Sequence, residues 1–295
     1  MRFQFRSALD GRLSGIHASP QPGVSVEFAE HKEYAPGDDL RHLDWKAFAR
    51  TDKFNIRQFA RETHTEVFLV VDQSASMDFS ADGRTSKRLF AARLAASLAW
   101  VLLHQNDSVG LLAPLPKGGL EVVPARSHPS HYLVLQDALS RHLAQGADKV
   151  GHCEGDAPLN HAFEYLVSRK VRRSAIIVLS DLLMPSSLLF PYLSHLRLGG
   201  NSCWLIHLLD PAEWDFAQEG AGRAFPFDGS VLFRSPESGH GLMLDARASK
   251  GAYIRRFGAW LRETRRNAQE ISVDYSTTNT DTDAVEFIYR FLQER

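Results

Sequence analysis

Two runs of consecutive apolar residues in this chain each lead directly to an aspartate. Residues 67–71 (VFLVV) precede Asp72, and residues 175–179 (AIIVL) precede Ser180 and Asp181. An uninterrupted apolar run of this length is typical of a strand in a parallel sheet that helices cover on both faces. The pattern therefore predicts two buried strands, each with an acidic residue at its carboxyl end.

Helix-period patterns lie between these runs. Leu94, Leu98, Val101 and Leu102 recur at three- and four-residue spacings, which predicts an amphipathic helix over about residues 85–104. A third apolar run is followed by another aspartate and predicts a further strand. That strand is expected at residues 203–209, and further helices are expected at about residues 130–143, 159–170 and 250–269 and from residue 282.

Shorter strand patterns complete the series. Residues 108–113 and 120–123 flank the turn-rich segment 114–119. Because that segment is too short for a crossover helix, the two flanking stretches are expected to form an antiparallel hairpin at the sheet edge. Residues 211–245 have a loop-like composition with two short strand patterns, which predicts an inserted hairpin. Residues 271–275 are expected to form the last strand.

The alternation of strands and helices predicts an α/β fold. We expect a Rossmann-like, mostly parallel sheet with an antiparallel edge strand and helices on both faces, over residues 66–295. Residues 1–65 differ, because they are rich in charged and aromatic residues, turn-prone, and without a long apolar run. They are expected to form a small N-terminal extension that packs against the main domain.

Composition excludes several classes of protein. Hydrophobic residues make up 44% and charged residues 23% of the chain, and 34 Lys and Arg nearly balance 35 Asp and Glu. This balance indicates neither disorder nor a nucleic-acid-binding surface. No apolar stretch approaches the roughly 20 residues of a membrane-spanning helix. Cys153 and Cys203 have no metal-binding spacing, so a protein of the reducing cytoplasm, without a transmembrane segment, is expected.

Asp72 and Asp181 are the leading candidates for chemistry. Ligands of open α/β sheets bind outside the carboxyl ends of strands, where the strand order reverses. The hydroxyls of Ser74 and Ser76 can face the same point as the two carboxylates, and Mg²⁺ prefers such oxygen ligands. One hypothesis is therefore a Mg²⁺ site formed by Asp72, Ser74, Ser76 and Asp181. The alternative is that the two acids bond loop amides and helix starts without any ion.

The order of elements and the sequence Asp72-x-Ser74-x-Ser76 resemble the von Willebrand factor A fold with its metal-ion-dependent adhesion site. More specifically, residues 33–51 (EYAPGDDLRHLDWKAFART) resemble the signature of the bacterial domain of unknown function 58 family. The resemblance covers nearly the whole chain. It continues at residues 58–62, 210–213 and 237–239.

This resemblance implies a protein partner. Genes of the family commonly lie beside those of MoxR-type AAA+ ATPases and other A-domain proteins, so such an ATPase is the expected partner, in a chaperone-like or maturation role. A metal ion with two neutral hydroxyl ligands could accept an acidic side chain of that partner. The chain departs from the adhesion-site pattern at Ala157, where A-domains place a threonine ligand; Asp156 could replace it.

Functions from different classes remain open. The preferred one is a non-enzymatic protein-interaction module. The alternative is a magnesium-dependent phosphohydrolase, because phosphoaspartate enzymes also carry an aspartate after their first strand; however, Ser74 stands where those enzymes carry their general acid. A structural scaffold with an empty site is a third possibility. Asp210 and Glu213 are expected to fix their loop, and the sequence contains no nucleotide-binding glycine motif.

Overall fold

The computed structural model describes residues 27–34, 43–51, 54–60, 65–115, 119–145, 158–214, 229–235 and 240–293. These residues belong to two compact units, one within Leu13–His64 and one that contains Thr65–Arg295. In the smaller unit, strands β1 (Glu27–Glu33) and β2 (Asn55–Ala60) pair antiparallel, and helix α1 spans Trp45–Thr51. Asp44 caps this helix, because its Oδ1 accepts a hydrogen bond from the N–H of Ala47 at 3.0 Å. Packing of an N-terminal extension against the main domain stays a prediction.

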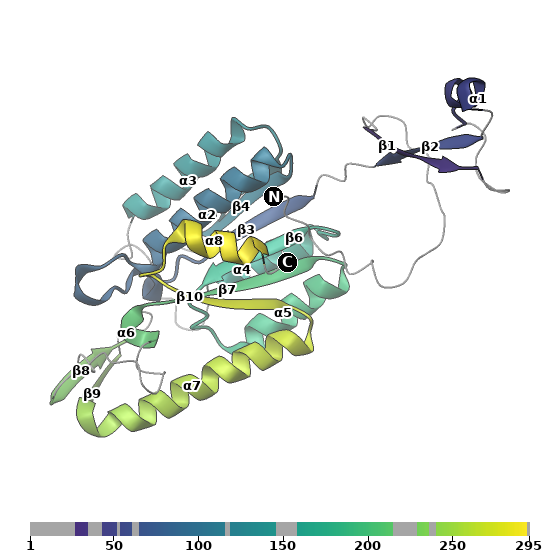
Figure 1. Cartoon of the computed structure of the whole chain (residues 1–295). Coiled ribbons are helices and arrows are strands. Elements are labelled where there is room, and N and C mark those ends of the chain that lie inside the picture. The colour runs from purple at the N-terminus through teal and green to yellow at the C-terminus, as the bar shows by residue number, and fades with distance from the viewer. Residues whose placement is uncertain are drawn as a thin grey trace. The chain divides into compact units, whose positions relative to one another are not determined.

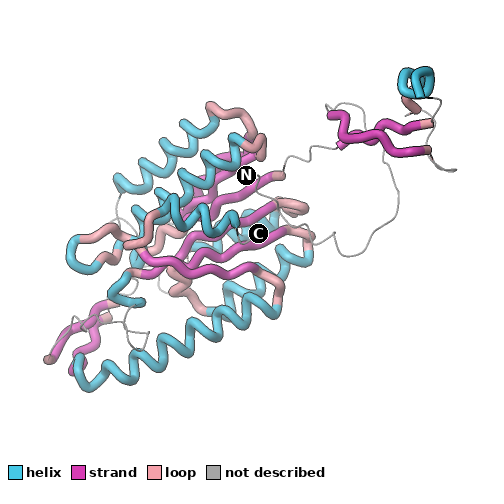
Figure 2. The backbone as a smooth tube through the Cα atoms, in the orientation of Figure 1, coloured by secondary structure: helices cyan, strands magenta, loops and turns pink. Residues whose placement is uncertain are grey.

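A six-stranded sheet forms the centre of the larger unit (Figure 2). Its strand order is β10-β7-β6-β3-β4-β5, and all neighbours are parallel except β4 and β5. Numbered by their order along the chain, these strands run 6-5-4-1-2-3, which is the order of doubly wound α/β folds. The strands are β3 (Glu66–Val71), β4 (Ser108–Pro114), β5 (Leu120–Arg126), β6 (Ala175–Ser180), β7 (Ser202–Leu209) and β10 (Asp274–Asn279).

Helices cover both faces of this sheet (Figure 1). Leu69 and Val71 of β3 face an apolar core shared with α2, α3 and α8, whereas Phe68 and Val70 face a second core shared with α4, α5 and α7. Burial on both faces explains why β3 is apolar at consecutive positions. The helices are α2 (Lys87–His104), α3 (His131–Gln145), α4 (Leu159–Ser168), α5 (Ser186–Leu198), α7 (Ala246–Glu270) and α8 (Ala284–Gln293).

The structure confirms the predicted fold class, a mostly parallel α/β sheet of the von Willebrand factor A-like type with an antiparallel edge strand. In the segment where an inserted hairpin is expected, a short helix α6 (Pro211–Trp214) precedes the antiparallel strands β8 (Ser230–Arg234) and β9 (Gly241–Asp245). Among the described residues, no helix has both the length and the apolar character that crossing a membrane requires.

One strand differs from its prediction. The last strand was expected at residues 271–275, but β10 begins only at Asp274. Ser272 has a φ of +56°, and the N–H of Val273 donates to the C=O of Ala268 at 2.8 Å. This turn closes the end of α7 and keeps the chain out of the sheet until Asp274, so the expectation for residues 271–273 was wrong.

Candidate functional site

The two acids expected at strand ends lie where the strand order of the sheet reverses. β3 has β4 on one side and β6 on the other. Asp72 directly follows β3 and Asp181 directly follows β6. The N–H of Asp72 donates to the C=O of Leu179 at 3.0 Å, so the pairing of the two strands continues to the first acid. Burial raises the pKa of Asp72, and the nearby Asp181 carboxylate raises it further, to about 6.

The loop after β3 is held by hydrogen bonds among the expected metal ligands. Asp72 Oδ1 accepts a hydrogen bond from the N–H of Ser74 at 2.8 Å. The hydroxyls of Ser74 and Ser76 lie 3.1 Å apart, and both side chains are buried. The structure thus brings Asp72, Ser74 and Ser76 together, as the sequence predicts, but it does so through protein hydrogen bonds.

Ser180 joins this loop to the loop after β6. Its hydroxyl donates to Asp72 Oδ2 at 2.6 Å and accepts a hydrogen bond from the N–H of Leu182 at 2.8 Å. Leu182 has a φ of +55°, a left-handed conformation that is costly for a bulky residue. The hydrogen bond to Ser180 and the burial of the Leu182 side chain hold this conformation. Both carboxylate oxygens of Asp72 therefore accept hydrogen bonds from the two loops.

A buried ammonium ion neutralises the second acid. Lys87 Nζ lies 2.8 Å from Asp181 Oδ2 and 3.0 Å from Glu213 Oε1, and the Lys87 side chain is only 1% exposed. Burial alone would lower the pKa of Lys87, but the carboxylates of Asp181 and Glu213 raise it above its ordinary value. Lys87 is the first residue of α2, where the helix dipole disfavours a cation. The two carboxylates compensate for that position and keep Lys87 charged.

A second buried cation, Arg88, fixes the loop after β3. Its guanidinium donates to the side-chain oxygen of Gln73 at 2.8 Å and to the backbone carbonyls of Gln73 and Ser74, each at 3.3 Å. It also forms an ion pair with Asp78. The planar guanidinium, with its several donors, thereby orients the loop that carries three of the expected ligands.

The fold family implies a divalent ion at these residues, and their surroundings fit such an ion poorly. The oxygen donors are of the kind that Mg²⁺ takes. However, both oxygens of Asp72 accept protein hydrogen bonds, and Asp181 already forms an ion pair with the ammonium group of Lys87. A divalent ion added there would be repelled by Lys87 at short range. Mg²⁺ binding to Asp72, Ser74, Ser76 and Asp181 stays a prediction, and Asp156 and Ala157 lie outside the described residues.

His207 is a second titratable group whose pKa is shifted, and it interacts electrostatically with Asp181. It is buried in β7, and its Nδ1 lies 2.7 Å from the hydroxyl of Tyr275. Burial lowers the pKa of His207 to about 4, although the Asp181 carboxylate acts in the opposite direction. His207 is therefore neutral at pH 7, and protonating it opposes folding.

Asp72 and His207 predict opposed pH dependences over the same range. Asp72 has a folded pKa of about 6 against an ordinary value of 3.8, so its contribution to the unfolding free energy decreases as the pH rises between these values. His207 has a folded pKa of about 4 against 6.5, so its contribution increases as the pH rises. Each term is worth roughly 3 kcal/mol from about 1.4 kcal/mol per unit of pKa.

Removing one of the two groups should expose the other. As the pH rises from 4 to 7, the unfolding free energy of Asp72→Asn should increase by roughly 2–3 kcal/mol more than that of the wild type, as measured in denaturant titrations. His207→Gln should lose a similar amount over the same range. Profiles of Asp72→Asn and wild type that stay parallel would contradict the raised pKa of Asp72.

Two exposed hydrophobic side chains lie beside these buried charges. Phe79 is 40% exposed and follows the loop after β3, and Leu183 is 55% exposed and follows Asp181. The ring of Phe79 lies 5.7 Å from Lys87 Nζ, and the N–H of Leu183 donates to Asp181 Oδ1 at 3.3 Å. Phe79 and Leu183 therefore form an apolar rim beside the buried charges, and a partner protein could cover them.

The buried cations Lys87 and Arg88 were not predicted from the sequence. For the neighbouring acids Asp210 and Glu213, the prediction was correct only in part. Asp210 fixes its loop as predicted, because its carboxylate accepts hydrogen bonds from the N–H groups of Ala212 and Ala81 at 2.8 and 3.2 Å. Glu213 does more, since it also binds Lys87. A signal was present: Lys87 and Arg88 occupy the first turn of a helix, which normally favours acidic residues.

Comparisons with known proteins give a family and no activity. A family model described as "Protein of unknown function DUF58" matches residues 30–266. The uncharacterized protein Rv1480 of Mycobacterium tuberculosis is 28% identical over 293 residues, which cover 98% of this chain and 86% of that protein. Among solved structures, the conserved hypothetical protein BatB from Bacteroides thetaiotaomicron has a TM-score of 0.41 and 17% identity, and covers 78% of this chain and 100% of its own. The SpRpn10 VWA domain has a TM-score of 0.29 and 11% identity, over 53% of this chain and 77% of its own.

Proposed function

Because this chain belongs to the protein family of unknown function DUF58, which has no assigned activity to carry over, we propose its function from the site: it is a non-enzymatic protein-interaction module. The partner binds across the loops that follow β3 and β6. The observation that carries this proposal is the exposure of Phe79 and Leu183, one on each of these loops, beside a buried cluster of charges.

The apolar rim supports contact with a protein. Aromatic side chains such as Phe79 are enriched in protein–protein interfaces, where a few well-packed side chains from which water is excluded carry most of the binding energy. Phe79 and Leu183 leave a considerable area open, whereas Asp72 and Asp181 are at most 3% exposed. The partner therefore contacts the rim first, and the buried charges set the shape of the loops.

The cation of this site is proposed to be the Lys87 ammonium group. It forms ion pairs with both Asp181 and Glu213, and so supplies positive charge where an adhesion site would hold a metal ion. Mg²⁺ held by Asp72, Ser74, Ser76 and Asp181 is the alternative proposal, and it requires that Lys87 moves away from Asp181. A change at Lys87 separates the two.

The phosphohydrolase alternative receives less support from the geometry. An attacking carboxylate needs a free oxygen facing the substrate. Asp72 is 3% exposed, and both of its oxygens accept hydrogen bonds, from Ser74 and Ser180. Ser74, which stands at the position of the general acid, has an ordinary alcohol hydroxyl and so supplies no proton near neutral pH.

The proposed partner is a MoxR-type AAA+ ATPase or another A-domain protein. The support is the family membership together with the resemblance described for the sequence. A cytoplasmic location, expected from the use of cysteine, belongs to the same proposal. A chaperone-like or maturation role is the finer form of this hypothesis.

The rim gives a direct test of the proposed interface. Phe79→Ser with Leu183→Ser should weaken binding of the purified protein to the MoxR-type ATPase of its own organism by about a hundredfold, since each buried hydrophobic anchor is worth roughly 1–2 kcal/mol or more. Biolayer interferometry with and without ATP measures it. The melting temperature should stay within a few degrees of the wild type.

Leu198 provides the matched control for this test. It is 86% exposed at the end of α5, and it follows no strand of the site. Leu198→Ser should leave binding unchanged. Equal losses from the rim and control variants would refute the interface, and an ATPase that binds neither wild type nor variant would refute this partner.

A further inference from the structure

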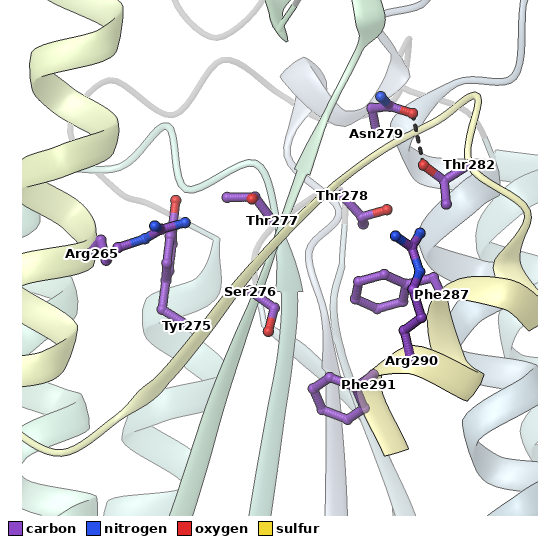
Figure 3. A pocket seen from close by; sticks show the side chains of 10 residues that line it. All are labelled: Arg265, Tyr275, Ser276, Thr277, Thr278, Asn279, Thr282, Phe287, Arg290 and Phe291. Atoms are coloured by element: carbon purple, nitrogen blue, oxygen red, sulfur yellow. Dashed lines mark hydrogen bonds between the residues drawn. The ribbon is translucent and has the colours of Figure 1, made fainter. Parts of the chain in front are cut away.

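β10 is an edge strand of the six-stranded sheet, and its outer side borders a hollow. β10 pairs only with β7 among the described strands. A cavity of about 360 Å³ lies along it, between α7 and α8 (Figure 3). Five consecutive residues, 275–279, line this cavity. Since side chains of a strand alternate between faces, only the free edge of β10 can present all five.

The backbone of this edge is ready to pair with another strand. The N–H of Thr280 donates to the C=O of Leu209 at 3.0 Å. This bond determines which residues of β10 hydrogen-bond to β7 and which face the free edge. Alternate residues of a parallel strand bond the same neighbour, so Ser276 and Thr278 turn their backbone groups to β7. Tyr275 and Thr277 then point their N–H and C=O groups outward. Within the described ranges these outward groups have no strand to pair with.

The side chains along the edge carry positive charge on both faces. Arg265 of α7 lies on the same face as Tyr275, and its guanidinium is 5.7 Å from the centre of that ring. Arg290 of α8 lies on the opposite face, near Phe287. The ten residues that line the cavity include these two arginines and no acidic residue. Arg290 also lies 3.8 Å from Glu286 in an exposed ion pair, which is weak and can exchange for another carboxylate. The lining of the groove is therefore complementary to a negatively charged ligand.

A buried hydroxyl in the same groove lacks a partner. Thr278 is 6% exposed and lines the cavity, and its Oγ1 has no hydrogen-bond partner among the residues that the structure describes. Figure 3 shows this hydroxyl on the α8 side of β10, toward Arg290. A buried polar atom without a partner costs stability unless a ligand or water satisfies it. Its position independently indicates that the groove receives a polar group.

We propose that the free edge of β10 binds an extended acidic peptide segment of a partner protein by strand addition. The outward N–H and C=O groups of Tyr275 and Thr277 pair with the peptide backbone, and Arg265 and Arg290 bind its carboxylates. This surface is formed by α7, β10 and α8 and contains neither Phe79 nor Leu183, so it is independent of the proposed function above.

The geometry also predicts the spacing of the acids. Side chains of an added strand alternate between the α7 face and the α8 face. One carboxylate reaches Arg265 and another reaches Arg290 only when the two acids are an odd number of positions apart. Adjacent acids therefore bind better than the same acids two positions apart.

Fluorescence anisotropy with the full chain tests the proposal. The probe is the fluorescein-labelled octapeptide TVTEETVT, and the comparison peptides are its isomer TVETETVT and the neutral TVTQQTVT. The first peptide should bind at least about fivefold more tightly than the isomer, and binding should weaken with added salt. Arg265→Gln and Arg290→Gln should each weaken it by about tenfold, while Arg262→Gln, an exposed arginine of α7 outside the groove, should leave it unchanged.

A backbone variant tests strand addition itself. Thr277→Pro removes an outward N–H and leaves the bonds to β7 in place, and proline is tolerated at such edge positions. It should abolish peptide binding. If this variant fails to fold, the two arginine variants still decide the outcome.

Four results would overturn the proposal. The first is the lack of saturable binding up to about 1 mM peptide, and the second is equal binding of the neutral peptide. The third is displacement of the peptide by glutamate or inorganic phosphate alone at similar concentrations. The fourth is a wild-type dimer that Thr277→Pro dissociates. The last two would assign the groove to a small anion or to a second copy of the chain.

Discussion

Replacing Lys87 by methionine is expected to lower the unfolding free energy by about 3–5 kcal/mol, the usual cost of removing one partner of a buried ion pair. Methionine retains the apolar stem, so the loss comes from the charge. Asp181 and Glu213 lie 2.8 and 3.0 Å from Lys87 Nζ and would face each other without a cation. Denaturant titration at pH 7 measures the effect, and the deficit should shrink at lower pH, because burial raises the pKa of Glu213 and this carboxylate can then bind a proton.

The same variant decides between the two proposed cations. If the ammonium group serves as the cation of the site, Mg²⁺ should not change the melting temperature of the wild type but should raise that of Lys87→Met, because the oxygens of Asp181 become available. Lys250→Met, at an exposed position of α7, is the control and should behave like the wild type. A wild type stabilised by Mg²⁺ at millimolar concentration would refute the role given to Lys87 and support the metal site expected from the sequence.

The sheet could be predicted from sequence because its central strands are buried on both faces. β3 and β6 read as short continuous apolar runs that each end in an acidic residue, a pattern typical of buried strands in a parallel sheet. β10 was placed three residues too early for the opposite reason. Its sequence, DYSTTN, is that of an edge strand whose polar side chains border a groove, so it carries no apolar run.

The candidate site was predictable only as far as topology determines it. Parallel strands end at the same edge, and this alone brings Asp72 and Asp181 together. The burial of Lys87 depends on where the first turn of α2 meets the loop after β6, which the sequence does not encode locally. A lysine on a helix is normally exposed, so the sequence gives no reason to expect Lys87 in a buried ion pair.

Removing the second buried cation, Arg88, is expected to destabilise mainly the loop after β3. Arg88→Met should lower the unfolding free energy by about 2–4 kcal/mol, because the carbonyls of Gln73 and Ser74 lose donors in a buried region. Arg88→Lys should recover only a minor part, since one ammonium group cannot reach the acceptors that a planar guanidinium spans. Amide hydrogen exchange, measured by mass spectrometry, should become faster in residues 73–79 of the variant than in the same residues of the wild type. Exchange in β3 should change less.

Arg84 supplies the control for that change, because it is an arginine of the same segment with a different environment. It pairs with Asp281 at 2.7 Å, and both side chains are more than a third exposed, so Arg84→Met should cost less than about 1 kcal/mol. If Arg88 acts by shaping the loop, Arg88→Met should also reduce partner binding as strongly as the loss of Phe79 and Leu183, although Arg88 is 3% exposed and cannot itself be a contact. Normal partner binding by Arg88→Met, together with unchanged exchange in residues 73–79, would show that the loop after β3 does not depend on this buried cation.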